Sequence, residues 1–92
     1  NARSIVAKVK ALNPKPGTWF ELGGSRVKVI KATEINETGK PGVIINKNLT
    51  IACSENAVQI LELQKEGKKK MTAREFLIGN KLEVGTNINS DV

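Results

Sequence analysis

Residues 57–79 read AVQILELQKEGKKKMTAREFLIG. The first seven are aliphatic or β-favouring, which predicts a core strand over 57–63. Thr72 and Glu75 have capping-box spacing: the Thr72 hydroxyl can accept from the Glu75 amide while the carboxylate accepts from the Thr72 amide. A short helix is therefore expected after Met71, ending at Gly79 because glycine enters the left-handed region without a Cβ clash. Three lysines, 68–70, are then expected on a loop held between a strand and a helix.

Length and composition favour one domain with an anionic partner. The 92 residues can bury a single core without a metal or a disulfide. Fifteen Lys and Arg against nine Asp and Glu give a net charge of +6, which favours nucleic acid or another anionic surface. The single cysteine, Cys53, excludes an internal disulfide and fits a reducing compartment. Because it shares a predicted strand face with Leu49 and Ile51, we interpret it as a small core residue. Neither a membrane-spanning run nor a signal peptide is indicated.

The chain begins with an amphipathic pattern that predicts a helix over 4–12, with Ser4 as N-cap. Proline ends the helix after residue 13, and residues 14–17 (PKPG) are expected to form a stiff turn. Lysines 8 and 10 lie at the border of the apolar stripe or opposite it, where they are either solvated or free to bind. The stripe itself consists of Ile5, Val6, Val9 and Leu12.

A hairpin is expected next, with a strand over 18–22, a tight primed turn at glycines 23 and 24, and a return strand over 26–29. The return strand alternates basic and valine residues, which places Arg26 and Lys28 on one exposed face. That face could bind an anion or simply protect a sheet edge from aggregation. The alternation changes phase at residues 30–32, which predicts a bulge or a bend.

The remaining pattern predicts a mainly β fold. A polar loop over 34–42 precedes short strands at 43–45, 49–53 and 57–63, and the strand at 49–53 is expected to point its apolar residues inward and its small or polar ones outward. Short strands with polar turns, flanked by two helices, favour a small antiparallel barrel, closed or nearly closed. We expect a helix and linker turn over 1–17, the barrel with its C-terminal helix over 18–82, and a frayed tail over 83–92, all in one domain.

Catalytic chemistry is not predicted for this chain. It contains no histidine, and its only cysteine is on a predicted core face, so neither a Cys–His pair nor a zinc site can be assembled. The acids are scattered among basic residues and turns. The glycines belong to turns, and none forms a phosphate-cradling motif before a helix. We therefore predict no catalytic, cofactor-binding or metal-binding residue.

Phosphate contacts are the binding mode that the residues favour. Proteins that bind single-stranded nucleic acid stack its bases on exposed aromatic rings. The aromatic residues of this chain are only Trp19, Phe20 and Phe76. One of the first two must point inward and Phe76 lies on a helix core face, which leaves at most one ring. Cations contacting the phosphates of a structured RNA are the remaining mode, although each cation could be only a solvated charge. The candidate contacts are Lys68, Lys69 and Lys70, followed by Lys8, Lys10, Arg26, Lys28 and Arg74.

Several segments together resemble the C-terminal domain of methionyl-tRNA formyltransferase. They are residues 61–71 with Phe76 and Leu77, residues 11–20 (ALNPKPGTWF), the 52–57 hairpin and the Pro41-Gly42 turn. In the family's order they cover most of residues 5–82. The chain departs from the family pattern at Lys15, where an aromatic residue usually stands between the two prolines.

The resemblance implies an OB-like barrel that holds initiator methionyl-tRNA. It also implies a larger cytoplasmic enzyme, expected to be monomeric and not membrane-bound, whose separate N-terminal catalytic domain is the second partner. That domain would transfer a formyl group from 10-formyltetrahydrofolate to the methionine amine, so the folate site would lie outside this chain. Two alternatives remain open. One is an interdomain or protein-interaction module, with an apolar patch around Trp19 and Ile78. The other is the matching domain of a formyltetrahydrofolate dehydrogenase or a sugar formyltransferase, with no RNA partner.

Overall fold

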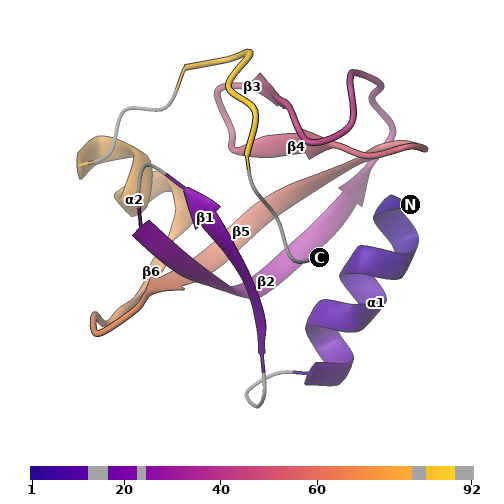
Figure 1. Ribbon diagram of the computed structural model, residues 1–92. Coiled ribbons are helices and arrows are strands. Elements are labelled where there is room, and N and C mark those ends of the chain that lie inside the picture. The colour runs from indigo at the N-terminus through magenta and orange to yellow at the C-terminus, as the bar shows by residue number, and fades with distance from the viewer. Residues whose placement is uncertain (13–16, 23–24, 80–82, 89–92) are drawn as a thin grey trace.

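A computed structural model describes residues 1–12, 17–22, 25–79 and 83–88 (Figure 1). Residues 14–16 of the expected turn at 14–17, and the whole expected turn at 23–24, lie outside this described part. The chain is mainly β, with a short helix at each end of the strand set, as the sequence predicts. In chain order the elements are α1 (Ala2–Leu12), β1 (Thr18–Leu22), β2 (Ser25–Ile35), β3 (Ile44–Asn46), β4 (Thr50–Ala52), β5 (Ala57–Lys65), β6 (Lys70–Thr72) and α2 (Ala73–Gly79).

The six strands form one antiparallel sheet built around β5. The order is β1-β2-β5-β4-β3, and β6 also pairs with β5. One edge of β5 pairs with β2, while its other edge is shared by β4, opposite residues 57–59, and β6, opposite residues 62–64. Because β1 and β3 stand at the two ends of this order, the sheet is not closed. The expected mainly β fold with a short helix at each end is confirmed, and its antiparallel sheet is open, with β1 and β3 at the ends.

The strand β2 contains the predicted irregularity. Val29 pairs with Leu63 and Lys31 with Glu62, and the register shifts on both sides of Lys31. The two shifts cancel, because Ala32 pairs with Ile60 in the register that Val29 has with Leu63, so neither strand gains a residue. Buried Val29 is followed by buried Ala32, which is the change of alternation that residues 30–32 predict. After this irregularity β2 continues to Ile35, so the first two residues of the expected 34–42 loop belong to the strand.

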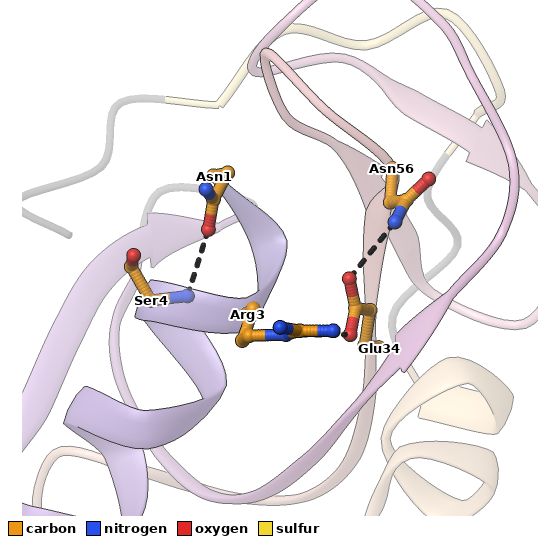
Figure 2. A network of polar contacts seen from close by, with 5 residues as sticks. All are labelled: Asn1, Arg3, Ser4, Glu34 and Asn56. Atoms are coloured by element: carbon orange, nitrogen blue, oxygen red, sulfur yellow. Dashed lines mark hydrogen bonds and ion pairs between the residues drawn. The ribbon is translucent and has the colours of Figure 1, made fainter.

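Helix α1 begins earlier than the sequence pattern indicates, and its N-cap is Asn1. The Asn1 Oδ1 accepts a hydrogen bond from the Ser4 amide at 2.9 Å, so the prediction of Ser4 as N-cap is wrong (Figure 2). Nearby, Glu34 of β2 ties the helix to the sheet. Its carboxylate lies 3.8 Å from Arg3 Nε and accepts from Asn56 Nδ2 at 2.8 Å (Figure 2). With Ala2 and Val9 buried, α1 packs on the sheet core as the apolar stripe predicts.

Helix α2 has the predicted capping box. The Glu75 amide donates to Thr72 Oγ1 at 3.1 Å, and the Thr72 amide donates to Glu75 Oε1 at 3.0 Å. The helix ends at Gly79 as expected, but that glycine is not in the left-handed region. Phe76 is fully buried and fixes the helix over the end of β5 and β6.

The alternation expected for residues 49–53 is wrong. Thr50 and Ala52 are buried, whereas Ile51 and Cys53 are half-buried and pack at the margin of the core. The reason lies in the turn before the strand, where Leu49 adopts a positive φ of 57° and is itself buried. A left-handed residue reverses the direction in which the following side chains point, and simple alternation counted through the turn misses this.

Residues 83–88 are not a frayed tail. The Ile44 amide donates to the Thr86 carbonyl at 2.9 Å, the Gly85 amide to the Ile44 carbonyl at 2.7 Å, and the Ile88 amide to the Gly42 carbonyl at 2.9 Å. This segment satisfies backbone groups along β3 that would otherwise lack partners, and it needs no apolar period to do so. Residues 89–92 lie outside the described part. No helix within the described ranges is long and apolar enough to cross a membrane.

Candidate nucleic-acid interface

A row of outward side chains crosses four strands at one level. Trp19 of β1 pairs with Lys28 of β2, Lys28 with Gln64 of β5, and Gln64 with Lys70 of β6. Residues directly opposite each other in an antiparallel sheet point to the same face. The neighbouring residues in these strands, Phe20, Val27 and Leu63, are buried, so the row faces away from the core.

Trp19 lies under two of the candidate cations. The Arg26 guanidinium carbon is 4.5 Å from the ring centroid and Lys28 Nζ is 5.8 Å from it. Both distances fit cation–π contact, in which the negative face of the ring attracts the cation. Phe20 is the inward member of the pair, at 2 % exposure, as the sequence requires of one of them. The half-buried ring of Trp19 therefore contacts two basic side chains.

The loop between β5 and β6 is held against β2. The Glu66 amide donates to the Arg26 carbonyl at 3.0 Å, and Gln64 Nε2 donates to the Lys68 carbonyl at 2.8 Å. Lysines 68 and 69 are exposed on this loop, as predicted. The expected position of Lys70 on the loop is wrong, because Lys70 is the first residue of β6. It pairs with Gln64, next to the pair of Met71 with Leu63.

We call Arg26, Lys28, Lys68, Lys69 and Lys70 the basic face. Two of its members form exposed ion pairs: Arg26 Nη1 lies 3.7 Å from Glu66 Oε2, and Lys70 Nζ lies 3.6 Å from Glu62 Oε1. The side chains of Lys68 and Lys69 make no ion pair with any described residue. The basic face thus combines paired and unpaired cations, with an excess of positive charge.

The other three candidates lie elsewhere. Exposed lysines 8 and 10 are on α1, which lies at the right in Figure 1, whereas the β5–β6 loop lies at the lower left. Arg74 is exposed on α2 and lines a groove with Lys47 of the β3–β4 turn. Sequence reasoning missed Lys47 and the role of Trp19, since only the fold brings each of them beside a candidate cation.

Among the described residues, no cluster of three or more His, Cys, Asp or Glu could hold a metal ion. Two titratable groups have shifted pKa values. Burial raises the pKa of the Cys53 thiol, against a smaller opposing effect of the N-terminal charge, so the thiol is protonated at neutral pH. The hydrogen bond from the Thr72 amide, and then that from its hydroxyl, lowers the pKa of Glu75.

The fold and its charges define a small, mainly β domain with a pinned basic surface. Residues 1–81 match the family described as Formyl transferase, C-terminal domain, and the chain belongs to that family.

Relatives that carry this domain are named methionyl-tRNA formyltransferase. The protein of Paramagnetospirillum magneticum is 45 % identical over 86 residues, which cover 94 % of this chain and 28 % of that protein. The protein of Rickettsia bellii is 43 % identical over 86 residues, covering 91 % of this chain and 28 % of its own length. That of Bradyrhizobium diazoefficiens is 42 % identical over 88 residues, covering 91 % and 28 %. The chain therefore spans less than a third of the relatives that it matches.

Proposed function

We propose that this chain is the C-terminal domain of a methionyl-tRNA formyltransferase and that it holds tRNA through phosphate contacts. The single observation that carries this proposal is the basic face. Its cations come from β2, the β5–β6 loop and the start of β6, and the hydrogen bond from the Glu66 amide to the Arg26 carbonyl joins the loop to β2. The name of the relatives, methionyl-tRNA formyltransferase, supplies the class of RNA. A fixed cluster of cations on a rigid scaffold suits a polyanion whose phosphates have a fixed spacing.

The binding mode follows from the surroundings of these cations. Trp19 is covered by Arg26 and Lys28, so we assign base stacking no part in recognition. Charge and shape remain, which position an RNA without reading its sequence. If about four phosphates are neutralised, the slope of log K against log salt is roughly −3 to −4. The lysines of α1 and Arg74 stay in the proposal as secondary contacts.

We propose that the formyl transfer takes place in the part of the relatives that this chain does not cover. There an N-terminal domain would transfer the formyl group of 10-formyltetrahydrofolate to the amine of methionine on initiator tRNA, in the cytoplasm. The described residues of this chain would hold the RNA while that step takes place. The proposed contribution to translation initiation is thus one of positioning.

The test is a titration of the 92-residue chain against a folded tRNA at three salt concentrations, with an RNA duplex of similar size as control. We expect micromolar or weaker binding, a steep loss of affinity with salt, and little preference between the two RNAs. Absence of binding at low salt, or binding that salt does not weaken, would contradict the proposal.

One observation favours a second function, that of an interdomain packing module. Ile78 of α2 is 79 % exposed and lines the groove that holds Arg74 and Lys47. Leu61 and Leu77 line the same groove, and contiguous exposed apolar surface is what indicates a protein contact. Trp19, the other residue expected in such a patch, is half-buried beneath cations. Failure of the RNA titration, together with loss of Ile78 exposure to solvent probes in a longer protein, would support this function.

A further inference from the structure

We propose that Glu66 is an internal competitor for phosphate at Arg26, and that it thereby sets the RNA affinity of the basic face. This inference rests on the proposed function and deepens it. Glu66 belongs to the same loop as Lys68 and Lys69, yet its carboxylate lies 3.7 Å from the Arg26 guanidinium. A carboxylate and a phosphate oxygen are both anionic acceptors for the same N–H groups. A phosphate that binds the Nη1 edge of Arg26 therefore takes the place of Glu66.

The backbone holds Glu66 in the competing position. Its amide donates to the Arg26 carbonyl at 3.0 Å, and the Lys68 amide donates to the Lys65 carbonyl at 2.9 Å, which closes the turn around Gly67 at a φ of 78°. The main chain thus holds Glu66 beside Arg26, so that its carboxylate stays within reach of the guanidinium. Changing the side chain of Glu66 leaves these backbone bonds available.

Arg26 can exchange its partner without leaving Trp19. The guanidinium carbon lies 4.5 Å from the Trp19 ring centroid, within the range of a cation–π contact. The N–H groups point outward in the plane of the guanidinium, and Nη1 is the one that faces Glu66. A phosphate oxygen can replace the carboxylate at this edge while the cation–π contact persists. Trp19 then keeps Arg26 in place in both the free and the bound state.

The competition is weak enough for a polyanion to overcome. The side chains of Arg26 and Glu66 are 52 % and 64 % exposed, and exposed ion pairs contribute little because water screens them. An RNA also gains the neighbouring Lys68 and Lys69, which have no acidic partner among the described residues. Glu66 therefore lowers affinity without preventing binding.

The test compares Glu66→Gln with Glu55→Gln in tRNA titrations near 0.1 M salt. Both variants remove one negative charge, but Glu55 lies in the β4–β5 turn beside the start of α1, where its carbonyl accepts from the Ala2 amide. Trp19 is the only tryptophan, so its emission reports binding next to Arg26 without a label. We expect Glu66→Gln to bind tRNA about two- to fivefold more tightly than Glu55→Gln, the range that an exposed ion pair allows.

The same comparison in an Arg26→Gln background separates a pairwise effect from a change of net charge. The gain from Glu66→Gln should disappear there, because the competing contact no longer exists. An equal gain for the two Glu→Gln variants, or a gain that persists without Arg26, would overturn the inference while leaving salt-sensitive RNA binding intact. Absence of salt-sensitive binding by the unmodified chain would instead overturn the proposed function, and this inference with it.

Discussion

At the scale of single residues, Glu75 shows how one side chain links local structure to pH. Its carboxylate accepts hydrogen bonds from both the amide and the hydroxyl of Thr72, at 3.0 and 3.1 Å. The hydrogen bond from the amide is the larger cause of the lowered pKa of Glu75. These bonds favour the carboxylate over the acid, so the folded chain binds the proton less readily than the unfolded chain does. The resulting contribution to stability is present above the unfolded pKa and is lost as the pH falls through the folded one.

We predict that Glu75→Gln removes this part of the pH dependence. Thermal melts of both proteins at several pH values from 7 down to 3 should show the unmodified chain losing more stability than the variant below about pH 4, the ordinary glutamate range. Melting curves with the same acid dependence for both proteins would show that the carboxylate does not hold the helix start.

At the same scale, some local features were predictable from the sequence and others were not. The Thr72–Glu75 bonds were predictable because the two residues are local and their spacing is specific. The cap of α1 was misplaced because Asn1 and Ser4 are both good N-caps, and propensity alone does not choose between them. The positive φ of Leu49 carries no compositional signal, since leucine rarely adopts it, and it reversed the expected alternation of the next strand.

At the scale of elements, α2 depends on one buried ring. Phe76 has 0 % exposure, and Lys65 Nζ lies 5.5 Å from its centroid. The helix has only seven residues, so its own hydrogen bonds are too few to keep it folded without packing. Through Phe76 the helix anchors the β5–β6 ladder to the core, close to the start of β6 at Lys70.

We predict that Phe76→Ala lowers the free energy of unfolding by about 3–5 kcal/mol. Small domains have total stabilities of about 5–15 kcal/mol, so this loss is a large share of the total. Urea denaturation followed by circular dichroism measures the loss, with Phe76→Leu as the control that keeps most of the buried volume. A cost below about 1 kcal/mol for the alanine variant would contradict the anchoring role.

Element boundaries were predictable where the hydrophobic periodicity is strong. Their prediction failed where strand pairing depends on a partner that is distant in the sequence. The irregularity in β2 was visible as a change of phase, because the valine and lysine alternation there is regular. The strand β6 was missed because three residues carry no period, and its existence depends on the free edge of β5. Residues 83–88 pair with β3 for the same reason, through backbone groups that no side-chain pattern reveals.

At the scale of the whole molecule, the candidate site is assembled from segments far apart in the chain. The sequence indicated which cations are exposed, since they alternate with core residues or lie in turns. Their grouping was not predictable: antiparallel pairing brings Lys28 and Lys70 into one row, whereas α1 carries Lys8 and Lys10 away from it (Figure 1). The acids that pair with Arg26 and Lys70 were equally hidden, because ion pairs across strands depend on register.

The salt dependence of tRNA binding by Lys68→Ala/Lys69→Ala tests the central claim most directly. Lys40→Glu is the matched control, because it changes the net charge by the same amount from the exposed 36–42 loop, where it touches no member of the basic face. The account predicts that the double variant lowers the slope of log K against log salt by about two, the value for two lost phosphate contacts, while the control leaves the slope unchanged. Equal slopes for the unmodified chain and the double variant would contradict the claim that the basic face holds the RNA.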